Sequence, residues 1–468
     1  MKQLRLRFAS IFVVNCLLLA VDANGLAQCE IEPIIGTTGK VLKELKLSKP
    51  AQSSADFLLT LKANASGASW QTRGAEAAIL TVFVDGRYNQ DLILFAGEKT
   101  FEYQAQLGKI GAGEHIISLV LNEARSAQNA RRVKIQSAFV VAFEDLIANA
   151  STTDRSRPAY IATINAPVIY LRPDTIDKFS DVPLLTYYEI FDEPENIKRI
   201  RYTTIFTNED GGTQSAALMA RWGRMTDIEW VYEIRVRENG EILSEIYQAA
   251  NHETKKFTGN RFGSHPLITD ATDNNNFADA GCSPLRVSPM LVQTNLSDGS
   301  RETVMDAFPW TYRIMAEEAI REGRVNPNKL GANTIDDPRE YLYAEIYSEP
   351  ENAAINVEAE TAAGEKFTSD GENKFLRVSR PGFVRIALRV PQKNRAADFP
   401  EKVSVGCYAV SNDSAAAGVC RNARLVKLVR LDRSYKPTVK RLDTNAQNIK
   451  VGQKIILTVG SKKITSRR

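Results

Sequence analysis

The chain has 468 residues, of which 43% are hydrophobic and 25% are charged, and its formal net charge at pH 7 is +4. At roughly 100 to 200 residues per domain, this length indicates about three domains and excludes a single small module. The proportions are close to those of average globular proteins, so they exclude a wholly disordered chain and a membrane protein with many spans.

The first 27 residues have the three features of a secretion signal. Basic residues precede an apolar run over 8–21, and small residues follow at Gly25 and Ala27. Cleavage after Ala27 fits this pattern, and cleavage after Ala23 is an alternative. The apolar run is too short for a membrane span, which needs about 20 residues, and no later stretch approaches that length. We therefore expect a signal peptide over 1–27 and a protein without a transmembrane segment that is secreted or resides in the periplasm or cell envelope.

The N-terminal part of the mature chain has the pattern of short strands. Runs rich in β-branched or aromatic residues cover 77–86, 91–96, 101–107, 115–123 and 132–139, and turn residues separate them. Strands at about ten-residue spacing predict an antiparallel β-sandwich over 28–148. His115 lies at a strand entrance, where we expect a structural role. The polar, breaker-rich segment 149–159 predicts a linker.

The central region, 160–335, contains the clearest strand pattern of the chain. In 227–237 (DIEWVYEIRVR) every even-numbered residue is apolar, and the odd-numbered residues are mostly charged. Because side chains of a strand alternate between its two faces, Asp227 and Glu229 are expected on the same face, with Cα atoms roughly 6.5 to 7 Å apart. The pattern therefore predicts two carboxylates on one surface.

A hairpin is expected to bring a histidine to these carboxylates. Asn239-Gly240 follows the strand, and this dipeptide favours a two-residue type I′ turn. With that turn, residues whose numbers sum to 479 face each other, so His252 is opposite Asp227, with Cβ atoms about 4.5 to 5.5 Å apart. On the other face, Trp230 is expected in the core. A bulge would shift the register and separate the three side chains.

Asp227, Glu229 and His252 could serve three purposes. They could hold a divalent cation, since carboxylate oxygens suit Ca²⁺, Mg²⁺ or Mn²⁺ and imidazole extends the choice to Zn²⁺. They could instead form a catalytic acid/base group in which Asp227 orients His252 and Glu229 modulates its pKa. The third interpretation is a solvated charge cluster in which the acids pair with Arg221 or Arg224, which would contribute at most about 1 kcal/mol.

Several motifs of the central region occur in the same order as in a known family. They are NAPVIYLRPD (165–174), IRYTTIF (200–206), TDIEW (226–230), the strand pair that ends at His252, and HPLITDATDNNNFADAG (265–281). With these motifs the region resembles the vacuolar protein sorting-associated protein 62 family of fungi and plants, which is similar in turn to the necrosis- and ethylene-inducing toxins of plant pathogens.

The resemblance implies a sandwich with an acidic, cation-binding strand pair. Asp227 and Glu229 match the Asp-x-Glu of these relatives, and His252 matches a histidine after the second strand. Trp230 stands where the relatives usually have a histidine, so the likeness does not extend to a histidine-rich metal cradle or to cytolytic activity. The Asn and Asp side chains of 270–279 could supply further oxygen ligands or simply form a turn. His265, before Pro266, is expected at a loop or strand entrance.

One helix and a third β domain complete the expected architecture. Apolar spacing in 309–322 and the stop signal Gly323 predict a helix that covers one edge of the sandwich. Strand patterns return from Tyr341, which predicts a C-terminal β domain over 336–468. The predicted fold class is thus all-β, with multiple antiparallel β-sandwiches and one helix.

Cysteine and charge distribution add two expectations. Removal of the signal leaves four cysteines in an oxidising compartment, and we expect Cys407 with Cys420 and, over a longer range, Cys29 with Cys282. From Arg421 to Arg468 there are 14 Lys or Arg residues against two Asp. This basic C-terminal region could bind an anionic surface polymer or lipid headgroups, or it could be a solvated strand face. Export argues against nucleic acid as the partner.

No standard enzyme signature occurs in the chain: GxSxG, HExxH, a Walker loop and a dinucleotide fingerprint are all missing. This favours a binding protein over an enzyme. Our leading hypothesis is an exported protein of several β-sandwiches that binds a surface polymer or partner, with a divalent-cation site in the central domain and no organic cofactor. The alternatives are a metal-assisted extracellular hydrolase that uses Asp227, Glu229 and His252, and a membrane-active, toxin-like protein.

Overall fold

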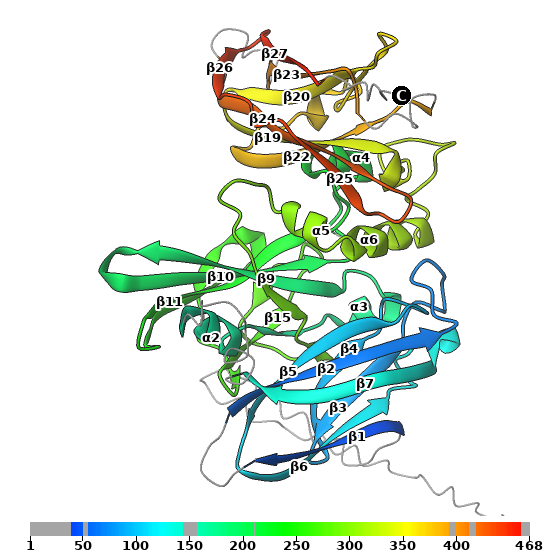
Figure 1. Cartoon of the computed structure of the whole chain (residues 1–468), viewed down its shortest axis with the longest axis vertical. Coiled ribbons are helices and arrows are strands. Elements are labelled where there is room, and N and C mark those ends of the chain that lie inside the picture. The colour runs from blue at the N-terminus through cyan, green and yellow to red at the C-terminus, as the bar shows by residue number, and fades with distance from the viewer. Residues whose placement is uncertain are drawn as a thin grey trace, which may run out of the picture.

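The structure is a computed structural model that describes residues 39–49, 55–143, 157–209, 211–392, 399–410 and 418–459. The expected signal peptide lies outside these residues, as does the 149–156 part of the expected linker. Six sheets fall into three groups along the chain, which we call the N-terminal, central and C-terminal units. Figure 1 shows them stacked along the long axis of the molecule, in chain order. The predicted all-β fold class with several sandwiches is confirmed.

The N-terminal unit contains two antiparallel sheets that pack face to face, β1-β6-β3-β4 and β5-β2-β7. Alternation of apolar and polar residues places one face of each sheet in the shared core, as in β2, where Leu59 and Leu61 are fully buried. The strands are β1 (Lys40–Lys49), β2 (Ala55–Ser66), β3 (Ile79–Val84), β4 (Arg87–Ile93), β5 (Phe101–Ile110), β6 (Gly113–Leu121) and β7 (Arg132–Ala142).

The central unit has a six-stranded sheet, β13-β12-β11-β10-β9-β18, and a smaller one, β14-β15-β8-β17, to which β16 is attached. Most pairs are antiparallel, but β15 pairs with β8 and β18 pairs with β9 in parallel. The long strands are β9 (Pro183–Glu193), β10 (Ile197–Phe206), β11 (Ile228–Arg237) and β12 (Ile242–Gln248). The short strands are β8 (Val168–Tyr170), β13 (Thr254–Lys256), β14 (Arg261–Phe262), β15 (His265–Asp270), β16 (Phe277–Ala278), β17 (Arg286–Val287) and β18 (Met290–Gln293).

The C-terminal unit is a third sandwich, with sheets β22-β19-β24-β25 and β21-β20-β23-β27, and β26 pairs with β24. The predicted disulfide between Cys407 of β23 and Cys420 of β24 is confirmed, with Cα atoms 5.9 Å apart, and it joins the two sheets. Cys282 is also disulfide-bonded. Cys29 lies outside the described residues, so its pairing with Cys282 stays a prediction. The strands are β19 (Tyr341–Glu351), β20 (Ala353–Glu360), β21 (Lys366–Thr368), β22 (Gly382–Arg389), β23 (Lys402–Ala409), β24 (Val419–Leu431), β25 (Pro437–Arg441), β26 (Gln447–Lys450) and β27 (Lys454–Thr458).

The predicted helix over 309–322 is α6 (Trp310–Arg321), and it contacts all three units rather than one sandwich edge. Trp310 stacks on Phe95 of the N-terminal unit with ring centroids 5.3 Å apart. On the other side, the Tyr312 hydroxyl accepts a 2.7 Å hydrogen bond from Arg385 of β22. Four shorter helices were not predicted: α2 (Arg157–Ile164), α3 (Pro173–Lys178), α4 (Ser215–Trp222) and α5 (Thr303–Ala307). Positions 157–159 of the expected linker thus belong to α2. No described helix is long and apolar enough to cross a membrane.

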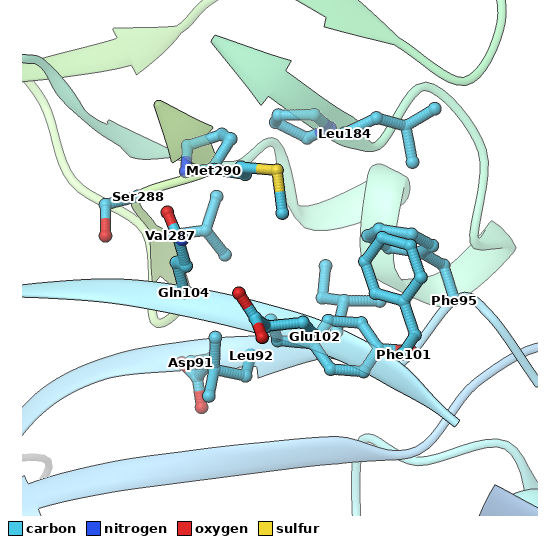
Figure 2. A pocket seen from close by; sticks show the side chains of 14 residues that line it. Asp91, Leu92, Phe95, Phe101, Glu102, Gln104, Leu184, Val287, Ser288 and Met290 are labelled. Atoms are coloured by element: carbon cyan, nitrogen blue, oxygen red, sulfur yellow. The ribbon is translucent and has the colours of Figure 1, made fainter. Parts of the chain in front are cut away.

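The junction between the N-terminal and central units is tightly packed. Arg286 stacks on Phe262 at 4.4 Å and donates from Nε to the Asn89 carbonyl at 2.5 Å. Figure 2 shows the cavity that remains there, between β4 and β5 on one side and Leu184 and Met290 on the other. Its volume is about 40 Å³, which is enough for a water molecule but not for a ligand of several heavy atoms.

Candidate functional site

Strand β11, which carries Glu229 and begins one residue after Asp227, contains a bulge. The register between β10 and β11 shifts between Tyr202 and Thr203, and the shift inserts Val231 into the alternating pattern. Val231 takes the fully buried position, while Trp230 is only half-buried, with the Arg201 guanidinium 5.3 Å from its ring. The prediction that Trp230 lies in the core is therefore wrong, because a bulge moves the following residues to the opposite face.

The hairpin between β11 and β12 has the predicted register but a different turn. Tyr232 pairs with Tyr247 and Arg235 with Ser244, as the predicted sum of 479 requires. Of the two expected turn residues, only Gly240 has a positive φ, of 89°, and its N–H donates to the Arg237 carbonyl at 2.9 Å. The turn is thus of the longer kind that ends in a left-handed glycine, and a register shift after Arg235 restores the predicted pairing.

His252 does not reach the position opposite Asp227. Strand β12 ends at Gln248, and the chain then makes a single helical turn, Ala250–His252, in which His252 has a φ of 58°. The imidazole is 54% exposed, its Nε2 contacts Asn274 Nδ2 at 3.1 Å, and its Nδ1 lies 3.9 Å from Glu229 Oε2. Within the described contacts, no hydrogen bond or ion pair joins His252 to Asp227. The expected triad is therefore reduced to a loose Glu229–His252 pair, and Asp227 does not orient the imidazole.

Asp227 is instead held by the loop after β15. Its Oδ1 accepts a hydrogen bond from its neighbour's N–H, at Ile228, and its Oδ2 accepts one from Asn275 Nδ2 at 3.0 Å. The same Nδ2 also donates to Asp181 Oδ1 at 2.7 Å, so the Asn275 amide bridges two buried carboxylates. The Asp and Asn residues of 270–279 were expected either as oxygen ligands or as a turn, and the structure places Asn275 directly on Asp227.

Burial raises the pKa of several acids at this place. The pKa of Asp227 is raised to about 7, first by burial and then by the charge of Glu229. The pKa of Glu209 is raised to about 7 by burial and by the charge of Asp227. Burial also raises the pKa of Asp270 to about 7, although Arg172 opposes the shift. We call Asp181, Glu209, Asp227, Glu229 and Asp270 the Asp227 cluster.

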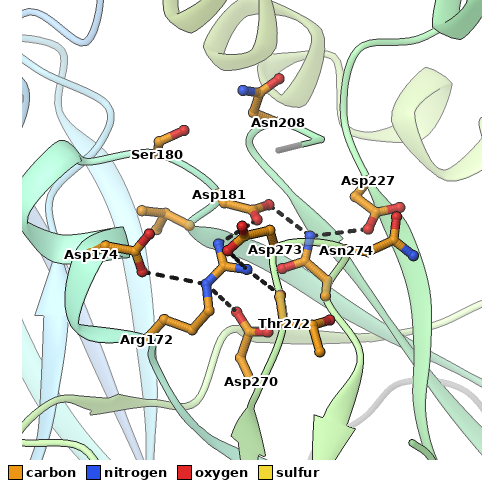
Figure 3. Close-up of polar contacts among 12 residues, drawn as sticks. Arg172, Asp174, Ser180, Asp181, Asn208, Asp227, Asp270, Thr272, Asp273 and Asn274 are labelled. Atoms are coloured by element: carbon orange, nitrogen blue, oxygen red, sulfur yellow. Dashed lines mark hydrogen bonds and ion pairs between the residues drawn. The ribbon is translucent and has the colours of Figure 1, made fainter. Parts of the chain in front are cut away.

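Arg172 makes the ion pairs with the acids on the Asp181 and Asp270 side of the Asp227 cluster. Arg172 is 7% exposed, and Figure 3 shows its guanidinium among several acidic side chains. Its ion pairs are with Asp181 (2.8 Å), Asp273 (3.5 Å), Asp174 (3.6 Å) and Asp270 (3.9 Å). Because β8 and β15 are parallel neighbours, they end at the same sheet edge, and this brings Arg172 to the loop that begins at Asp270.

Several buried polar atoms of this region have no hydrogen-bond partner among the described residues, including Glu209 Oε1 and Arg172 Nε. Asn275 is fully buried, and its Oδ1 accepts no hydrogen bond from the described residues. The Asp270 carboxylate is 1% exposed and makes no close hydrogen bond, but it lies 3.9 Å from Arg172 Nε, and Arg172 and the backbone of Thr272 both oppose the rise of its pKa. Buried polar atoms without a partner are uncommon, since each costs about 1–3 kcal/mol. Within the described residues, however, no group of three or more His, Cys, Asp or Glu side chains is arranged so that it could hold a metal ion.

Sequence reasoning found Asp227 and Glu229 but missed Arg172, Asp181 and Glu209. Arg172 stands in the NAPVIYLRPD motif, and parallel pairing of this motif with 265–270 was the missing signal. The other two histidines have structural surroundings, as expected. His265 begins β15, is fully buried and contacts the Ala166 carbonyl at 2.9 Å, while His115 contacts Asp85 at 2.7 Å.

Comparison with known proteins gives little further information. No family model matches the chain, and no curated protein is similar to it. Among solved structures, the chain is similar to the EclA C-terminal domain, described as a sugar-binding protein, with 15% identity and a TM-score of 0.17. The match covers 23% of this chain and 71% of that one. A TM-score this low does not support a shared function.

Proposed function

We propose that this chain is an extracytoplasmic binding protein whose central unit takes up a divalent cation at the Asp227 cluster. The observation that carries the proposal is the bridge from Asn275 to Asp181 and Asp227, next to buried oxygens of Asn275 and Asp270 that accept no close hydrogen bond. Carboxylate and amide oxygens are the ligands that Ca²⁺ and Mg²⁺ prefer. The resemblance of the central unit to the vacuolar protein sorting-associated protein 62 family remains part of this proposal.

Charge at the cluster supports a cation. Its five carboxylates face four arginines, Arg172, Arg224, Arg301 and Arg324, and the pKa values of four of these acids are raised in spite of them. The carboxylates do not form a closed ligand set, so the cation would keep several water ligands, as Mg²⁺ commonly does. Glu229 is next to the half-exposed His252, which gives the cluster a route toward solvent.

The disulfide-bonded cysteines support a location outside the cytoplasm. Both Cys407 and Cys420 are fully buried in a disulfide, and Cys282 is bonded as well. Disulfides persist in oxidising compartments and are rare in the cytosol. Export would also give the cluster access to the millimolar Ca²⁺ for which extracellular sites are commonly tuned.

Fewer cations of the basic C-terminal region are available to bind a polymer than its composition indicates. Three of its cations are consumed by carboxylates: Arg421 pairs with Glu351, Lys427 with Asp306 and Lys454 with Glu358. The cations that remain exposed in the described part are Arg433, Lys436, Arg441 and Lys450. We propose that an anionic surface polymer binds these four, and neutralising them together should abolish its retention without a change in folding.

Metal analysis of the purified mature protein tests the cation. We expect one Ca²⁺ or Mg²⁺ per chain in the wild type and none in the double variant Asp227→Asn/Glu229→Gln. Glu253→Gln is the matched control, since Glu253 is an exposed acid next to His252. Absence of stoichiometric metal from the wild type after dialysis against both cations contradicts the proposal, as does an equal metal content in the double variant.

A further inference from the structure

Two arginines gather on one tryptophan at the contact between the central and C-terminal units. The guanidinium carbon of Arg221 lies 4.6 Å from the centre of the Trp222 ring, and that of Arg380 lies 5.0 Å from it. Arg221 and Trp222 end helix α4, while Arg380 precedes β22. Arg380 Nη2 also donates to the Arg221 carbonyl at 3.3 Å, which fixes the two residues to each other.

Gly223 allows this approach. It ends α4 with a φ of 64°, and a Cβ atom at this position would lie 2.8 Å from Arg385 Cγ. Any larger residue would push the helix end away from β22, so the glycine brings Arg221 and Trp222 against the segment that carries Arg380. The arrangement is thus built by the fold and does not result from two long side chains meeting at the surface.

Neither arginine is neutralised by a carboxylate. Within the described residues, no Asp or Glu lies within ion-pair distance of Arg221 or Arg380. Glu302, the nearest acid that acts on Arg380, already binds Arg224 Nε at 2.8 Å. The Nε of Arg380 is buried and has no acceptor.

The charges that act on Arg380 are mostly positive. The pKa of Arg380 is lowered to about 10, chiefly by burial; the charge of Glu302 opposes this shift, and the charges of Arg224, Arg301 and Arg221 add to it. An aromatic ring attracts an arginine but carries no net charge, so Trp222 orients these cations without neutralising them.

We propose that Arg221 and Arg380, oriented by Trp222, bind the oxyanion of a phosphate or sulfate group. The planar guanidinium fork matches the oxygens of such a group, and no carboxylate of the described residues pairs with either fork. The site uses residues separate from the Asp227 cluster and from the exposed C-terminal cations, and it does not depend on a cation at Asp227.

Titration of the mature chain with sodium phosphate and sodium sulfate at low salt tests the site, with sodium chloride at matched ionic strength as reference. We expect a saturable rise in the unfolding temperature at millimolar phosphate or sulfate, where general salt effects are small. Arg380→Gln and Arg221→Gln should each weaken the apparent affinity at least about tenfold, the change that corresponds to about 1.4 kcal/mol. Arg380→Lys should recover only part of it, because lysine lacks the fork.

Arg87→Gln is the control for net charge, since Arg87 is exposed at the opposite end of the molecule. It should bind as the wild type does. If Arg380→Gln does not fold, the half-buried Arg221→Gln alone decides the test. A second titration with dextran sulfate identifies the source: retention that phosphate competes away assigns the group to a polymer, and binding of the free ion alone assigns it to the small anion. Unsaturable stabilisation, or equal affinity in Arg221→Gln and the wild type, overturns the proposal.

Discussion

The Asp227 cluster and the buried charges around Arg385 contain the same kinds of residues but differ in balance. Arg385 is fully buried, binds Asp306 with two 2.7 Å hydrogen bonds and binds Glu345 with one of 2.6 Å. Lys427 adds a second cation, 3.1 Å from Asp306. Burial alone would raise the pKa of Asp306, yet Arg385 and Lys427 hold it below its ordinary value. In the Asp227 cluster carboxylates exceed arginines, so burial prevails and the pKa values rise.

The comparison teaches that burial does not decide the charge state of an acid. Asp306 and Glu345, paired with Arg385 and Lys427, join the central unit to the C-terminal unit through α5 and β22, and the pKa of Asp306 is lowered there. In the Asp227 cluster, where carboxylates outnumber the arginines that act on them, the pKa values of Glu209, Asp227, Glu229 and Asp270 are raised. The first arrangement is suited to holding units together, and the second to taking up a proton or a cation.

The largest expected effect is at the balanced group. Arg385→Met leaves Asp306 and Glu345 buried with a single cation, and we expect a loss of about 3–5 kcal/mol in the free energy of unfolding, measured by chemical denaturation. Arg237→Met is the control, because both partners of its ion pair with Glu241 are exposed and the pair should be worth about 1 kcal/mol or less. Similar losses of unfolding free energy in both variants would show that the burial of the Arg385 ion pairs does not make them more stabilising than an exposed pair.

Removal of the disulfide tests whether the C-terminal unit depends on more than its charges. Cys407→Ala/Cys420→Ala opens a loop with a sequence separation of 13 residues, and we expect a loss of about 3 kcal/mol. Differential scanning calorimetry should show the change in the transition of the C-terminal unit. If only the transition of the central unit changes, the central and C-terminal units do not unfold separately.

The acidic cluster should respond to pH in the opposite sense from Asp306. Asp227 has a folded pKa of about 7 against an ordinary value of 3.8, so the folded state binds the proton more tightly than the unfolded state. Its favourable contribution is complete below about pH 4 and is lost as the pH rises through about 7, a change on the order of 2 kcal/mol or more. The contribution of Asp306, whose folded pKa is lowered, is present above its ordinary value and lost in acid.

Hydrogen exchange of the β11 and β12 amides between pH 4 and pH 8, corrected for the intrinsic exchange rates, measures this loss in the central unit. Asp227→Asn should flatten the dependence, because the amide keeps an acceptor for Asn275 without the charge. Ca²⁺ or Mg²⁺ should restore protection at pH 8 in the wild type alone. If protection instead increases with pH in the wild type, ionisation of the Asp227 cluster does not destabilise the central unit, and the prediction is wrong.

The smallest expected effect is at His252. Its side chain is 54% exposed and has no described contact with Asp227, so His252→Ala should change the free energy of unfolding by about 0.5 kcal/mol or less. It should also leave the pH dependence of the cluster unchanged. A large effect on the free energy of unfolding or on this pH dependence would mean that His252 acts together with Asp227, as the sequence predicted.

Short-range features of the site were predictable because they depend on neighbouring residues. Alternation in 227–237 identified a strand, and the Asn239-Gly240 turn led to the observed pairing of Tyr232 with Tyr247. The position of His252 was not predictable in the same way. A ladder extrapolated from its turn assumes that both strands continue, whereas β12 ends at Gln248 and β11 contains a bulge at Val231.

The sequence by itself determined the β architecture, helix α6 and the disulfide between Cys407 and Cys420, because periodicity, turn residues and cysteine spacing act over short stretches of chain. Only the tertiary structure decided which charges meet. Arg172 reaches Asp270 across 98 positions through parallel strands, and Lys427 is withdrawn from the basic surface by Asp306. Contacts between residues so distant in the chain depend on how sheets pair and pack, and no local pattern records that choice.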